Sequence, residues 1–144
     1  MTTVHRGSPV TTARHEALRS PLPAEQLALP APTTWLRERA GQFAAVAERP
    51  FHLLFDLAEY TRRTGLPFAA HYVAQVYRGE PDARLGVPLM VINLAHVPTR
   101  EAADRVFAHE LMHLRVPSYG HKKQAFAWAQ RALDQLASQP PPGL

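Results

Sequence analysis

Two histidines and a glutamate stand in the pattern His-Glu-x-x-His, in which Glu110 directly follows His109 and His113 comes four residues after His109. On a helix this spacing places both imidazoles one turn apart on one face, where both can bind the same zinc ion. Glu110 would then lie beside the metal, where its carboxylate can take a proton from metal-bound water and later deliver it to a leaving amine. The pattern therefore indicates a metal site with a general base next to it.

The segment around this motif predicts a buried helix. Thr99 is a suitable N-cap, and Glu101 and Asp104 favour the positive end of the helix. Pro117 forces the preceding residue out of helical geometry, so we expect the helix to end at Arg115. Apolar residues flank the motif on both sides, namely Val106, Phe107, Leu111 and Leu114. Because polar groups are costly to bury without partners, His and Glu in so apolar a helix favour a bound metal.

A zinc peptidase needs a third protein ligand and an open fourth position. No glutamate follows His113, and Asp134 is the only later carboxylate. The longer pattern with a third histidine six residues on also fails, because positions 116 and 119 are Val and Tyr. His121, eight residues after His113, is therefore the candidate third ligand, brought back by a short loop. The alternative for His121 is a surface polar residue at the start of the last helix.

Five other side chains have weaker claims on the site. Tyr119 could donate a hydrogen bond to the oxyanion formed on substrate attack, although an exposed loop tyrosine is the alternative. Asp104 and Asp134 could orient a ligand histidine through its second ring nitrogen. His71 and His96 are expected to be satisfied by local hydrogen bonds.

Around the motif, the periodicity and the turn residues predict an α+β fold. The expected helices span residues 33–48, 51–64, 99–115 and 121–138. The expected strand spans residues 89–94, and residues 70–77 fit either a strand or a helix. These elements predict a two- or three-stranded sheet packed on the motif helix and its flanking helices. The strand around Met90 would offer an edge that pairs with an extended peptide.

The chain has 144 residues, which suits one domain, and its 14 prolines cluster at the two ends. We expect residues 1–32 to be a flexible Pro-rich tail, residues 33–138 the folded domain, and residues 139–144 a short C-terminal tail. The absence of cysteine excludes disulfide scaffolds, cysteine proteases and iron–sulfur sites. No apolar run approaches the ~20 residues of a membrane span, and no secretory signal is recognisable, so a cytoplasmic protein is expected.

The motif and the residues after it resemble a known family. His109–His113, Leu114, Arg115, a short loop, His121 and an aromatic-containing helix are similar to the minimal zincins of the SprT-like and YgjP-like type. The resemblance covers about residues 87–138. It implies a minimal zincin fold, a zinc site of three histidines (His109, His113 and His121) and Glu110 as catalytic base. It also implies zinc metalloendopeptidase activity, in which a Glu-activated, zinc-bound water hydrolyses a peptide bond.

Two alternatives to a general peptidase remain open. SprT-like proteins include proteases that act on DNA-associated proteins, and the net charge of +4 permits DNA as a partner, although no DNA-binding motif is present. The second alternative is a zincin-fold binding or regulatory protein without turnover, against which the intact Glu110 argues. The expected partner is a protein or peptide substrate, and the sequence does not indicate the oligomeric state.

Overall fold

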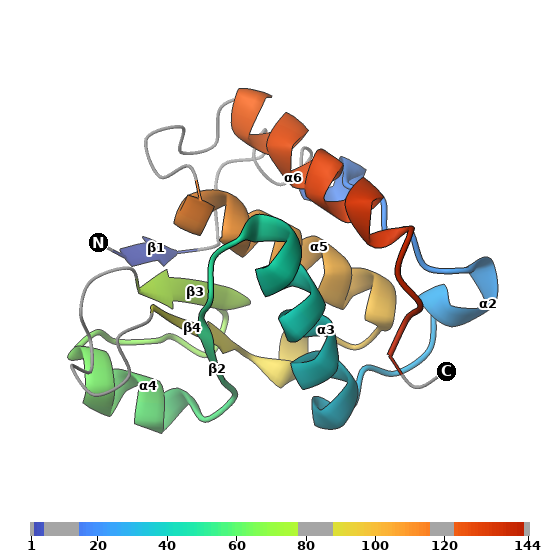
Figure 1. Ribbon diagram of the computed structural model, residues 1–144. Coiled ribbons are helices and arrows are strands. Elements are labelled where there is room, and N and C mark those ends of the chain that lie inside the picture. The colour runs from blue at the N-terminus through green and yellow to red at the C-terminus, as the bar shows by residue number, and fades with distance from the viewer. Residues whose placement is uncertain (1, 5–14, 78–87, 116–122, 143–144) are drawn as a thin grey trace.

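The computed structural model describes residues 2–4, 15–77, 88–115 and 123–142, and the fold of these residues is α+β (Figure 1). The strands are β1 (Thr2–Val4), β2 (His52–Leu54), β3 (Ala74–Tyr77) and β4 (Leu89–Ile92). The helices are α2 (Ala24–Leu27), α3 (Thr33–Ala47), α4 (Leu57–Thr64), α5 (Arg100–Arg115) and α6 (Lys123–Leu136), with the 3-10 turn η1 (Leu94–His96).

One mixed sheet with strand order β1-β3-β4-β2 forms the centre of the fold. β3 pairs antiparallel with β1 and β4, whereas β2 pairs parallel with β4. Successive β4 side chains point to opposite faces, as in any strand. Met90 and Ile92 belong to the main core beneath α3, α5 and α6, while Leu89 and Val91 belong to a smaller cluster that includes Tyr60 of α4. All four β4 residues are buried because helices cover both faces.

The sheet therefore differs from the sequence prediction in its size and in the place of β4. The described residues contribute four strands, where two or three were expected. β4 lies between β3 and β2, with Met90 opposite Val76 on one side and Leu53 on the other. The prediction that this strand offers an edge to a peptide is wrong, because both of its edges already pair within the sheet.

The predicted helix over residues 51–64 is divided into a strand and a shorter helix. The Asp56 side chain accepts hydrogen bonds from the backbone N–H groups of Ala58 and Glu59, so α4 begins at residue 57. β2, which precedes it, buries Leu53 in one core cluster and Leu54 in the other, because successive side chains of a strand point to opposite faces of the sheet. The C-terminal end of α4 is as predicted, because Gly65 adopts a left-handed conformation with φ 73°.

The strand predicted over residues 89–94 ends at Ile92 because of the residue after it. Asn93 accepts a hydrogen bond from the backbone N–H of Ala95 and so begins the turn η1. Its amide also donates to the carbonyl oxygens of Ala70 and Tyr72, which fixes the approach to β3. The ambiguous segment 70–77 is thus a strand in its last four residues.

Residues 15–32 do not form the tail that the prolines suggested. Leu18 and Leu22 are 3% and 6% exposed and belong to the same core as α5 and α6. The Arg105 guanidinium donates to the Leu18 carbonyl oxygen at 3.0 Å. The packed domain therefore includes residues before the predicted boundary at residue 33. We call residues 15–27 the N-terminal segment.

The chain's other end also contacts the domain, where a short tail from residue 139 was expected. Gln42 of α3 donates a hydrogen bond to the Pro140 carbonyl oxygen at 2.8 Å. α6 ends at Leu136, two residues earlier than predicted. Among the described helices, none combines the length and the apolar character needed to cross a membrane.

Candidate metal centre

Helix α5 carries the His-Glu-x-x-His motif through the most buried part of the fold. Thr99 accepts a hydrogen bond from the backbone N–H of Ala102, which is the predicted N-cap contact, and the helix ends at Arg115 as predicted. Residues 106–114 are all buried. α3, α6, β3 and α2 all pack against this helix, so the stretch that carries the motif is covered on all sides (Figure 1).

The two motif histidines face each other across one helical turn. His109 Nε2 and His113 Nε2 lie 3.2 Å apart, and both side chains are buried. Two nitrogens bound to one tetrahedral zinc at ~2.0–2.1 Å would lie ~3.3 Å apart. The observed separation is therefore close to the one expected for two ligands of one zinc ion.

Glu110 is fully buried on the same helix. Burial raises the pKa of the Glu110 carboxyl well above its usual range, because the charged form loses its hydration. A dication beside the carboxylate would act in the opposite direction and favour the charged form. Tyr60 of α4 is also fully buried, and its pKa is raised first by burial and second by the charge of Glu110. Glu110 therefore acts electrostatically on a residue of the smaller core cluster.

A third histidine lies against the other edge of the His109 ring. His15 Nδ1 is 2.9 Å from His109 Nδ1, and the ring centroids are 5.0 Å apart. Phe126 of α6 presents a T-shaped contact to the same ring, with centroids 5.4 Å apart. His15 was expected in a flexible tail, and the sequence gives no signal for this contact between residues 94 positions apart.

The predicted third ligand, His121, and the candidate oxyanion residue, Tyr119, lie outside the described residues. Within the part of the chain that is described, no group of three or more His, Cys, Asp or Glu side chains is arranged to hold a metal ion. The structure thus brings His109, Glu110 and His113 together and leaves His121 as a prediction.

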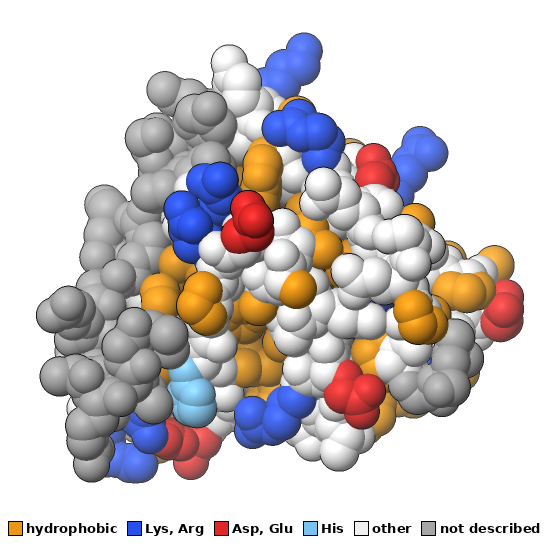
Figure 2. Space-filling view, viewed as in Figure 1, with side chains coloured by type: hydrophobic (Ala, Val, Ile, Leu, Met, Phe, Trp, Pro, Cys, Tyr) orange, Lys and Arg blue, Asp and Glu red, His pale blue; other side chains and the backbone are white. Residues whose placement is uncertain are grey.

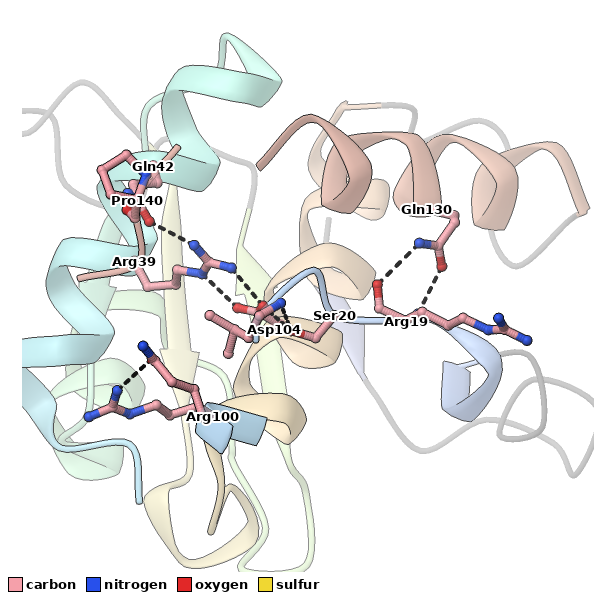
Figure 3. Close-up of polar contacts among 10 residues, drawn as sticks. Arg19, Ser20, Arg39, Gln42, Arg100, Asp104, Gln130 and Pro140 are labelled. Atoms are coloured by element: carbon pink, nitrogen blue, oxygen red, sulfur yellow. Dashed lines mark hydrogen bonds and ion pairs between the residues drawn. The ribbon is translucent and has the colours of Figure 1, made fainter. Parts of the chain in front are cut away.

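Asp104 has a partner other than a ligand histidine. Its two oxygens accept hydrogen bonds from Arg39 Nε and Nη2, both at 2.8 Å, and the Ser20 hydroxyl donates to one of them at 2.6 Å (Figure 3). Sequence reasoning missed this buried pair. A signal was available, because Arg39 lies four residues from both Trp35 and Phe43 on the apolar side of its helix.

The remaining candidates contact residues outside the motif. Asp134 accepts a hydrogen bond from Gln130 on the same helix. His96 Nε2 lies 2.7 Å from the Ala70 carbonyl oxygen, and the His71 ring packs edge-on against its neighbour Tyr72. His71 thus contacts its sequence neighbour through its ring, whereas the partner of His96 lies 26 residues away in the chain.

Comparison of the chain with protein-family models, with curated proteins and with solved structures finds no match.

Proposed function

We propose that this protein is a zinc-dependent metallopeptidase of the minimal zincin type. The observation that carries the proposal is the 3.2 Å separation of His109 Nε2 and His113 Nε2, with Glu110 between them in sequence on the same buried helix. Two imidazoles and a water are ligands that zinc prefers. The small sheet packed against the motif helix also agrees with the arrangement that the zincin resemblance implies.

The proposed roles follow from the chemistry of each side chain. His109, His113 and His121 would hold the zinc ion. The ion would supply Lewis acidity, which polarises the substrate carbonyl and lowers the pKa of water. Glu110 would take a proton from the attacking water and then pass it to the leaving amine. The expected substrate is a protein or peptide.

One observation favours the second candidate function, a zincin-fold binding or regulatory protein without turnover. His109 and Glu110 have no exposed surface in this conformation. A peptide bond reaches Glu110 only if a covering segment moves, whereas a metal ion that serves structure or regulation needs no such access. Substitution of Glu110 by glutamine separates these two functions.

The face shown in Figure 2 gives little support to a DNA-associated substrate. On the face shown in Figure 2, Lys and Arg side chains are separated from one another by acidic and uncharged ones. A phosphate backbone is bound most strongly where several cations act together.

Zinc content of the purified protein tests the proposal. We expect about one zinc per chain in the wild type, and a sharp loss in His109→Ala, His113→Ala and His121→Ala. His96→Ala is the matched control, because His96 contacts only a distant loop carbonyl among the interactions described for it. Full zinc in His121→Ala would exclude that residue as the third ligand. A wild type that binds no zinc, or a zinc content unchanged in His109→Ala, would contradict the proposal itself.

A further inference from the structure

We infer that His15 is a positioning residue for His109, and that it holds the His109 ring with its Nε2 lone pair directed toward the metal. The inference rests on the proposed zinc site. It begins from the 2.9 Å contact between the two Nδ1 atoms, on the opposite edge of the His109 ring from the contact with His113. One ring thus engages a neighbour through each of its nitrogens.

The protonation of a zinc-binding imidazole indicates which of the two rings donates the hydrogen bond. A histidine that binds zinc through Nε2 is neutral and carries its remaining proton on Nδ1. His109 would therefore donate this N–H to His15 Nδ1, which accepts as a neutral ring protonated on its own Nε2. Zinc-binding histidines commonly donate their second N–H to a carboxylate or a carbonyl oxygen. In this chain the acceptor would be an imidazole nitrogen, Nδ1 of His15.

The chain that follows His15 is held by four further hydrogen bonds of the N-terminal segment. The Arg19 N–H and carbonyl both bond to the Gln130 side chain of α6, at 2.8 and 3.1 Å (Figure 3). Ser20 donates to Asp104 of α5, and the Leu18 carbonyl accepts from Arg105 of the same helix.

These anchors hold the residues just after His15 against α5 and α6. Leu18, one helical turn after His15, is buried in the main core, whereas His15 itself is only half-buried. A side chain that only filled space at position 15 would not need a nitrogen atom that faces Nδ1 of His109. The sequence suggested that Asp104 orients a ligand histidine. Its carboxylate instead accepts a hydrogen bond from Ser20 and so helps to hold the N-terminal segment.

The test compares two substitutions that differ in whether they keep the acceptor. His15→Leu keeps apolar bulk and removes the acceptor. His15→Asn places an amide oxygen close to the position of Nδ1 and keeps it. Glu16→Gln is the control, because Glu16 is exposed and adjacent. Zinc affinity is measured by competition with a chromophoric chelator, and the Co²⁺-loaded proteins are compared by visible absorption, which reports the ligand geometry. The melting temperature of the metal-free proteins shows whether each variant folds.

We expect His15→Leu to weaken zinc binding by about 10–100-fold and to alter the Co²⁺ spectrum, while His15→Asn recovers most of the affinity. Glu16→Gln should match the wild type. Zinc affinity in folded His15→Leu within about twofold of the wild type would overturn the inference and leave the zinc site intact. An equal loss in His15→Asn and His15→Leu would overturn it as well, because the acceptor would then be irrelevant.

A second measurement works on the metal-free protein, so that it separates this inference from the zinc proposal. The imidazole ¹⁵N shifts of His109 report which nitrogen carries the proton. We expect the proton on Nδ1 in the wild type and in His15→Asn, and a mixture of tautomers in His15→Leu. A wild-type His109 with its proton on Nε2 would overturn the inference, whether or not the protein binds zinc.

Discussion

Arg39 and Asp104 form a bidentate ion pair in the interior of the protein, with side chains only 1% and 0% exposed. The pair joins α3 to the first turns of the motif helix, and Arg39 also donates to Gln42. Such a pair fixes one relative placement of two helices, because its hydrogen bonds require a specific geometry.

Removal of one partner from this pair should be strongly destabilising. Arg39→Met leaves a buried carboxylate without its cation, so we expect a loss of about 3–5 kcal/mol in the free energy of unfolding, measured by urea titration. The control is Glu59→Gln, which breaks the part-exposed pair between Glu59 and Arg63 and should cost at most ~1 kcal/mol. Equal losses in the two variants would contradict the structural role of the buried pair.

The N-terminal segment should contribute to stability as a part of the core. Leu22→Ala removes a buried side chain and should cost about 2–5 kcal/mol. Leu29→Ala is the matched control, because Leu29 is 42% exposed and its truncation should cost little. For the same reason, a chain that begins at Thr33 should melt well below the full chain. An unchanged melting temperature in that truncation would support the flexible tail that the sequence suggested.

Tyr60→Phe should stabilise the protein, and more so at alkaline pH. Its buried hydroxyl has no hydrogen-bond partner among the described residues, so its removal should raise the free energy of unfolding at neutral pH by about 1 kcal/mol. Because the folded pKa is raised above the unfolded value of ~10, the unfolded chain loses its proton first. Wild-type stability should therefore fall as the pH rises above ~10, and Tyr60→Phe should fall less steeply. Parallel decreases in urea titrations of the two proteins would contradict this assignment.

Glu110→Gln separates a peptidase from a binding protein. Glu110 is not an expected ligand, so the variant should keep the wild-type zinc content. An amide cannot accept the proton of water, so hydrolysis of casein and of a peptide library should fall by at least ~10²–10⁴-fold. A chelator-treated wild type serves as the second inactive control. Chelator-sensitive cleavage that survives in Glu110→Gln would contradict the proposed role, and a wild type that binds zinc but cleaves nothing would favour the binding function.

Local signals explain which elements the sequence predicts well. The bounds of α5 follow from Thr99 at one end and Pro117 beyond the other, and both act on adjacent backbone. β2 was mistaken for helix because its three residues are set by the sheet beside them, with Leu53 opposite Met90 of β4. The spacing of apolar residues along the chain does not reveal such pairing between strands.

The candidate metal centre also combines contacts set by adjacent residues with contacts set by distant ones. His109, Glu110 and His113 could be named because one helical turn brings them together. His15 could not, because its contact depends on buried leucines and hydrogen bonds that hold the N-terminal segment against α5. Arg39 was within reach of sequence reasoning, since a charge within an apolar stripe indicates a buried partner.

The N-terminal segment has consequences for the order of events during synthesis. Arg19 is synthesised well before its partner Gln130, which lies 111 residues later in the chain. At a translation rate of ~5–20 residues per second, the segment waits several seconds before any of its partners on α5 and α6 exists. Closure of so long a loop is entropically costly, so these contacts should form late. A nascent chain halted before α6 should therefore lack the two Arg19–Gln130 hydrogen bonds, so that only the contacts with α5 would hold the segment next to His15.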